Sequence, residues 1–205
     1  MKNFDLIKLP FSKNNPITVQ VLGVCSCLAV TAQLKPAVVM AVSVTVVVAL
    51  ANRIISLLRN IIPPRIRIIV QLVVVSTLVV LVDQFLKAYM YDVSKQLSVF
   101  VGLIITNCIV MGRLEAFAMS NPPVPSLCDG IGNGLGYSVI LVTLGFVREL
   151  FGSGTLWGYP IMEKLGLYGI GYENNGLMIM PPMALILAGI IIWIQRTRNK
   201  DLQED

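Results

Sequence analysis

Uncharged hydrophobic runs alternate with short charged stretches along this chain and divide it into six segments. The segments cover residues 14–34, 36–52, 68–82, 97–112, 130–147 and 177–195. A bilayer core takes about 20 helical residues, and several runs are shorter than this, 97–112 in particular. A membrane β-barrel would instead show alternating segments of about ten residues. The pattern therefore predicts an all-α integral membrane protein with six transmembrane helices.

Segments one and four contain groups that are poor choices for a plain membrane anchor. Residues 97–112 carry Gly102, Asn107 and Cys108, and residues 18–31 repeat the design around Cys25. Polar, helix-breaking groups at membrane depth are costly unless they face protein or a cavity. Short or glycine-broken segments at matching places in two halves are typical of discontinuous helices around a midplane site. We therefore expect helices one and four to be broken or short.

The six segments divide into two halves of three helices. Because three is odd, the second half enters the membrane from the opposite face, so the halves are expected to form two inverted three-helix repeats. The predicted organisation is one membrane domain over residues 1–205. It comprises a cytoplasmic lead (1–15), a first repeat (16–95), a second repeat (96–195) and a cytoplasmic tail (196–205).

Composition and charge agree with a membrane protein. The chain is 56% hydrophobic and only 13% charged, with a mean hydropathy of +0.78, which excludes an ordinary soluble domain. Its net charge of +5 is read as basic cytoplasmic loops rather than as a nucleic-acid surface. Eleven of the 16 Lys and Arg residues fall on the side that holds both termini, and five fall on the other. Both termini are therefore expected in the cytoplasm, with the first membrane helix directing insertion in place of a cleavable signal.

The cysteines are the strongest candidates for chemistry. The chain has four Cys and no His, which excludes His-ligated metals and His-based catalytic dyads within it. Thiolates bind iron, and iron–sulfur clusters usually take four of them. Cys25 and Cys108 stand at corresponding places in the two halves, so they are expected to face each other. A partner chain would have to supply two more ligands.

Each of these cysteines also has a plainer interpretation, because a membrane Cys is often a small apolar filler. Cys27 cannot join Cys25 at one ion in a continuous helix, since neighbours two apart point about 200° apart. We favour Cys25, which follows Gly23-Val24. Cys128 is expected in a loop near a membrane edge, where the plainer interpretation is favoured.

Two carboxylates are candidates for an ion pathway, Asp83 and Asp129. They are either interfacial charges or waypoints for a cation, since ionisable groups near membrane depth often mark ion paths. Asp129 begins a stretch with four glycines, 129–136, which suits helix packing or close approach of carbonyls to an ion. Residues 113–129, rich in Pro, are expected to form a loop, with Arg113 and Glu115 as a surface pair.

Several stretches together resemble a known family. They are Leu22-Gly-Val-Cys25, Gln96 to Arg113, Asp129-Gly-Ile-Gly-Asn-Gly-Leu-Gly-Tyr137 and Arg148-Glu-Leu-Phe-Gly-Ser-Gly154. They are similar to the D-subunit family of the bacterial sodium-translocating NADH:quinone reductase (NqrD) and its counterpart in the Rnf complex (RnfE). The resemblance covers roughly residues 14–195.

The resemblance implies a pairing with a related E subunit of opposite orientation in the bacterial inner membrane. It also implies an iron–sulfur centre, expected to be [2Fe–2S], held in mid-membrane by two Cys from each of the two subunits. Cys25 and Cys108 are the matching positions here, and Asp83 and Asp129 match acidic positions associated with sodium handling. NAD, flavins and quinone would bind only on the other subunits of the complex (A, B, C and F). Cys27 and Cys128 depart from the family pattern.

Three other functions stay open from the sequence. The chain could be an Rnf-type ferredoxin:NAD oxidoreductase membrane subunit, although the sequence Gly102-Leu-Ile-Ile-Thr-Asn-Cys108 favours the quinone reductase. It could be a small secondary transporter with a solute site at the repeat interface. It could also be a purely structural membrane subunit.

Overall fold

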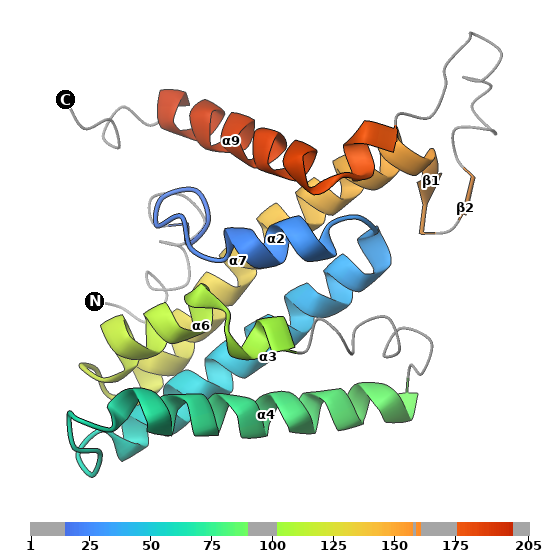
Figure 1. Ribbon diagram of the computed structural model, residues 1–205. Coiled ribbons are helices and arrows are strands. Elements are labelled where there is room, and N and C mark those ends of the chain that lie inside the picture. The colour runs from blue at the N-terminus through green and yellow to red at the C-terminus, as the bar shows by residue number, and fades with distance from the viewer. Residues whose placement is uncertain (1–14, 90–101, 158, 161–175, 199–205) are drawn as a thin grey trace, which may run out of the picture.

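The computed structural model describes residues 15–89, 102–157, 159–160 and 176–198 (Figure 1). Its helices are α2 (Val24–Val30), α3 (Leu34–Leu58), α4 (Arg67–Tyr89), α6 (Cys108–Arg113), the π-helix η1 (Leu114–Ala118), α7 (Pro123–Ser153), the 3₁₀-helix η3 (Gly176–Ile179) and α9 (Pro181–Arg198). Two strands of two residues each, β1 (Thr155–Leu156) and β2 (Tyr159–Pro160), form an antiparallel pair after α7. The expected all-α membrane architecture is confirmed.

Three of the described helices are long and apolar enough to cross a membrane: α3, α4 and α7, with 25, 23 and 31 residues. They match the expected segments two, three and five but extend beyond them. The first and fourth segments are not continuous helices. α2 has seven residues and follows an irregular stretch, whereas residues 102–105 form a helical turn that is interrupted before α6. The prediction of short or broken helices at these two places is confirmed.

Single residues explain both interruptions. Gly23 precedes α2 with a left-handed backbone (φ 77°), a conformation that residues with a Cβ rarely adopt. A Cβ at Gly23 would also lie only 2.6 Å from Cδ1 of Ile109, so the site demands glycine twice over. Asn107 precedes α6 with an extended backbone, and its side-chain oxygen accepts a hydrogen bond from the Ile109 amide at 3.1 Å. Asn is a favoured N-cap because it satisfies such an amide.

The start of α7 corrects the expected loop over residues 113–129. This stretch instead contains η1 and the first two turns of α7, which begins at Pro123. The physical reason is that proline breaks a helix interior but is tolerated in the first turn, where its missing N–H would have no intrahelical partner. Cys128 and Asp129 therefore lie inside a helix, and the prediction of a loop position for Cys128 is wrong.

Helices α3 and α7, the second helix of each half, form the centre of the molecule and lie side by side (Figure 1). Gly130 faces Ala49 and Gly134 faces Thr45, so residue numbers rise along one helix as they fall along the other. The helices are thus antiparallel, as two inverted repeats require. Glycines allow the two backbones to approach closely, and helix packing is the role the structure gives to the glycine-rich stretch of α7.

Candidate functional site

Cys25 and Cys108 line the same small pocket, of about 90 Å³. The lining residues are Gly23, Cys25, Ser26, Leu103, Thr106, Asn107 and Cys108. Both cysteines are exposed, whereas Ser26 and Asn107 behind them are buried. The structure therefore brings together the two thiols that the sequence singled out, at the surface of the chain.

Each of these thiols follows directly on a helix break. Cys25 is the second residue of α2, and Cys108 is the first residue of α6. The opening amides of a helix have no acceptor one turn earlier, and in α6 the Ile109 amide next to Cys108 is satisfied by the side chain of Asn107. Cys27, in contrast, is only 2% exposed and packs in the hydrophobic core. Of the two neighbouring thiols in α2, Cys25 is the one that lines the pocket.

A buried hydroxyl connects the elements that carry the thiols. Ser26 Oγ lies 2.8 Å from the carbonyl oxygen of Gly23 and 2.8 Å from the hydroxyl of Tyr137 on α7. The side-chain amide of Asn107 donates to the same Oγ at 3.3 Å. Sequence reasoning missed Ser26 and Tyr137. A signal did exist for Tyr137, because a tyrosine inside a membrane segment needs a partner for its hydroxyl.

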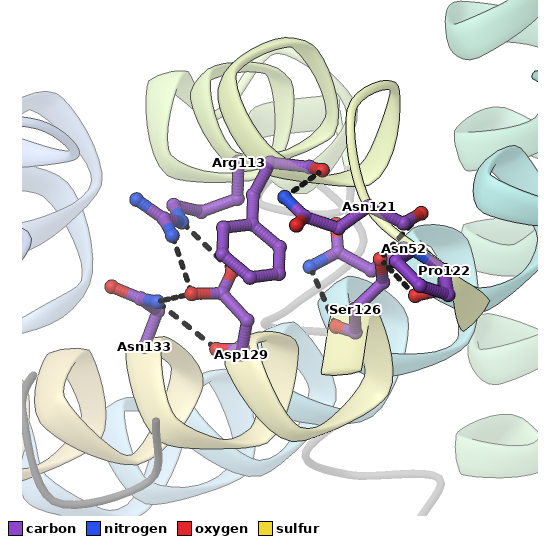
Figure 2. Close-up of polar contacts among 8 residues, drawn as sticks. Asn52, Arg113, Asn121, Pro122, Ser126, Asp129 and Asn133 are labelled. Carbon is purple, nitrogen blue, oxygen red and sulfur yellow. Dashed lines mark hydrogen bonds and ion pairs between the residues drawn. The ribbon is translucent and has the colours of Figure 1, made fainter. Parts of the chain in front are cut away.

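Asp129 forms a buried ion pair with Arg113 (Figure 2). Arg113 Nε donates to one carboxylate oxygen at 3.0 Å, and its Nη2 donates to the other. Asn133, one turn further along α7, donates to the second oxygen at 3.0 Å. The two charged side chains are only 11% and 4% exposed.

This pair corrects the expected surface contact between Arg113 and Glu115. Glu115 instead binds Arg67 at the start of α4 and accepts a hydrogen bond from Gln71. Helical residues two apart point in nearly opposite directions. Arg113 therefore reaches α7, while Glu115 reaches α4.

The two acidic candidates differ in their surroundings. The Asp129 carboxylate already accepts three hydrogen bonds, two of them from the cationic Arg113, so a cation would have to compete with Arg113 for its charge. Asp83 binds Lys87 one turn along α4, at 2.6 Å. Asp83 lies about 24 Å along α4 from Arg67, given a rise of 1.5 Å per residue. Arg67 binds Glu115, which is two residues from the Arg113 that holds Asp129. The structure does not bring the two carboxylates together.

The comparisons with known proteins agree with the helical membrane architecture. Residues 3–192 match the family model described as "Rnf-Nqr subunit, membrane protein". The chain belongs to the Rnf-Nqr family. This confirms the resemblance stated from the motifs.

Relatives of this Rnf-Nqr chain carry a specific name, that of the D subunit of the "Na(+)-translocating NADH-quinone reductase". Those from Shewanella sp. (strain W3-18-1) and Shewanella putrefaciens (strain CN-32) are 60% identical over 195 residues, covering 95% of this chain and 92% of each relative. The relative from Pseudomonas aeruginosa (strain LESB58) is 58% identical, covering 95% of this chain and 87% of its own.

Two further charges of the Rnf-Nqr chain are buried, against expectation. The sequence pattern places Arg148 and Glu149 at the close of the fifth segment, but α7 continues to Ser153. Arg148 is fully buried and donates to the ends of two short helices. Its acceptors are the carbonyl oxygens of Leu28, Met178, Ile179 and Met180 and the hydroxyl of Thr31. It thereby binds carbonyls at the end of α2 and in and after η3; carbonyls in the last turn of a helix lack intrahelical partners.

Glu149 binds the N-terminal end of a helix, where backbone amides lack partners. Its carboxylate accepts hydrogen bonds from the backbone amide of Leu34, which begins α3, and from that of Trp157 at 2.9 Å. α3 has no side-chain cap from its own N-cap residue, Gln33, so Glu149 supplies one from α7. The two charges expected to mark a membrane boundary in this Rnf-Nqr chain instead connect α7 to the ends of other helices: Arg148 to α2 and η3, and Glu149 to α3.

Proposed function

We propose that this chain is the D subunit of a Na⁺-translocating NADH:quinone reductase and that Cys25 and Cys108 provide half of the ligands of an intramembrane iron–sulfur centre. The observation that carries the proposal is the shared pocket: two exposed cysteines from two discontinuous helices line the same small pocket. The relatives from Shewanella and Pseudomonas support the choice of complex.

The donor set fits half of a [2Fe–2S] site. Among the described residues, no group of three or more His, Cys, Asp and Glu side chains gathers, so this chain offers two thiols at the pocket. A four-thiolate centre therefore needs two more from a partner, and we assign these to the related E subunit. Since both thiols are exposed, a partner's ligands can reach them.

A bound iron–sulfur group would supply a one-electron carrier between the two sides of the bilayer. This chain's own residues would perform the supporting work. Gly23 and Asn107 interrupt the helices so that both cysteines face one pocket. Hydrogen bonds to sulfur tune the potential of such centres, and the short helices α2 and α6 place both cysteines in their first turns. Ser26 lines the pocket beside Cys25, and its hydroxyl is hydrogen-bonded to Tyr137 on α7.

The remaining parts of the proposed complex lie outside this chain. NAD, flavins and quinone would bind on the A, B, C and F subunits, and membrane lipid would surround the exposed faces of the helices. We place the protein in the bacterial inner membrane with both termini in the cytoplasm. The charge count places Arg113 on the cytoplasmic side and Arg148 on the opposite side, but both are largely buried. Omitting both leaves the basic bias toward the cytoplasmic side in place.

For sodium, we propose Asp129 and Asp83 as pathway candidates with different requirements. At Asp129 a cation would compete with the charge of Arg113, which binds both carboxylate oxygens. Asp83 is paired with the half-exposed Lys87, so a cation that replaced this partner would break a weaker interaction. Asp129→Asn is therefore expected to raise the sodium concentration for half-maximal turnover. An unchanged sodium dependence would argue against its part in the path.

The test of the iron–sulfur role uses serine variants of each cysteine in the assembled complex. Cys25→Ser and Cys108→Ser are each expected to remove one iron–sulfur signal from the electron paramagnetic resonance spectrum and to stop quinone reduction by NADH. Cys27→Ser and Cys128→Ser are matched controls and are expected to keep both. If Cys25→Ser and Cys108→Ser retain wild-type iron and turnover, the iron–sulfur role is refuted, and a transporter or a structural subunit becomes the better description.

A further inference from the structure

The contact between the two thiol-bearing helices passes through one buried hydroxyl group. Ser26 directly follows Cys25, and Asn107 directly precedes Cys108. Their side chains meet at Ser26 Oγ, and Tyr137 of α7 meets them there. All three side chains are buried, with exposed fractions of 3%, 4% and 0%. The position of one cysteine relative to the other is therefore linked to these three groups.

The direction of each hydrogen bond follows from the valence of the serine hydroxyl. A hydroxyl has one donor and two acceptor lone pairs. Ser26 Oγ donates its hydrogen to the Gly23 carbonyl oxygen, which has none to give. The Asn107 amide nitrogen can only donate, so it takes one lone pair. The Tyr137 hydroxyl must then donate to the other, at 2.8 Å. Every hydrogen-bonding position of Ser26 Oγ is used.

Helix α7 also holds the far end of α6. Asp129 and Tyr137 are eight residues apart on α7, which is about 12 Å and close to two turns, so they lie on the same face. Asp129 binds Arg113, the last residue of α6, while Tyr137 reaches Asn107, which precedes α6, through Ser26. α6 is thus fixed to α7 near both of its ends, with Cys108 at the end governed by Tyr137.

We propose that Tyr137 is a positioning residue of the thiol pair. Through Ser26, its hydroxyl fixes α2 against α6 and so sets the separation of Cys25 and Cys108. The inference rests on the proposed function, because that separation matters for chemistry only if the two sulfurs share a bound group. Tyr137 does not line the thiol pocket and acts through the buried side chains behind the thiols, of which Ser26 is its hydrogen-bond partner.

The experiment removes the phenolic oxygen alone, with Tyr137→Phe in the complete complex. Tyr89→Phe on α4 is the matched control, because Tyr89 is 78% exposed and stacks on Phe85. The first readout needs no metal. In complex depleted of iron by a chelator under reducing conditions, a short bifunctional thiol reagent is added, and the Cys25–Cys108 linked peptide is quantified by mass spectrometry over time. The second readout is the shape and midpoint potential of the iron–sulfur resonance in intact complex.

Tyr137→Phe is expected to slow formation of the linked peptide by roughly two- to tenfold, the range set by the loss of one hydrogen bond. It is also expected to alter the resonance, while Tyr89→Phe changes neither. Ser26→Ala should produce a similar change, and the double variant should add little to it, because both act through one contact. A Tyr137→Phe complex with the wild-type linking rate and spectrum overturns the proposal.

Two further outcomes keep the test decisive. If Tyr137→Phe does not assemble, Ser26→Ala is measured instead, and a wild-type linking rate there overturns the proposal equally. If Cys25→Ser and Cys108→Ser retain wild-type iron and turnover, the proposed function fails, yet the linking rate still judges the positioning role. A failure of positioning alone would leave the iron loss in Cys25→Ser intact.

Discussion

A single methyl group added at Gly134 should push the two central helices apart. The new Cβ would lie 2.8 Å from both Cα and Cγ2 of Thr45 and 2.9 Å from its Oγ1. Ordinary van der Waals contact begins near 3.4 Å, so α3 and α7 would have to separate by roughly 0.6 Å. The Thr45 backbone cannot rotate away as a side chain could. Overpacking of this kind costs about 1–3 kcal/mol.

The assay is the thermal unfolding of the purified complex, followed by loss of this chain from the soluble fraction after heating. Gly134→Ala should lower the melting temperature by roughly 2–12 °C, taking about 2–4 °C per kcal/mol for a chain of this size. Two variants calibrate the result. Gly145→Ala would place its Cβ 3.3 Å from the Cβ of Ala37, where a small adjustment suffices, and should have a small effect. Gly189→Ala meets nothing within 4 Å among the described residues and should have none. If Gly134→Ala melts no lower than Gly189→Ala, the close approach of α3 and α7 is wrong.

Three further predictions concern charged side chains. Asp129→Asn leaves Arg113 buried without its partner, at a cost of about 3–5 kcal/mol; the yield of assembled complex should fall sharply, and adding Arg113→Gln should restore part of it. Glu149→Ala leaves two backbone amides uncapped, each worth about 1–3 kcal/mol, so it should lower the melting temperature at least as far as Gly134→Ala; an unchanged value would contradict the capping role. Asp83→Asn should change complex yield little, because a partly exposed pair such as Asp83–Lys87 contributes about 0.5 kcal/mol; a large loss of complex would show a contact beyond Lys87.

The helix interruptions could be predicted from the sequence because their causes are local. Glycine tolerates the left-handed backbone before α2, and asparagine caps the start of α6 with its own side chain. Asn107 directly precedes Cys108 and Gly23 lies two residues before Cys25, so the same pattern that predicted the breaks also predicted the meeting of the two cysteines in one pocket. Whether these thiols bind iron stays a prediction.

The proline-rich stretch before Asp129 misled the sequence analysis for an equally physical reason. Proline signals the end of a helix when it stands in the interior, and the start of one when it stands in the first turn. Sequence alone does not say which side of the proline is helical. The error displaced the start of α7 and made Cys128 a loop residue, although it is helical and partly buried.

The partners of buried charges could not be predicted because they come from distant elements. Arg113 meets Asp129 across the turn that joins η1 to α7, and Arg148 meets the carbonyl of Leu28 and the hydroxyl of Thr31, more than 100 residues earlier in the chain. Only the folded arrangement shows that these side chains stabilise helix ends rather than face water. The same holds for Tyr137, whose hydroxyl is 111 residues from its partner, Ser26.

The close seam between α3 and α7 has a mechanical consequence. At two places along this contact the backbones approach so closely that no layer of side chains separates the helices. These places are Gly130 against Ala49 and Gly134 against Thr45. The two long helices cannot slide past each other without a backbone collision, so they form a rigid unit. Relative motion of helices in this chain therefore falls to the short α2 and α6, which single side chains such as Tyr137 and Arg113 connect to α7 and its neighbours.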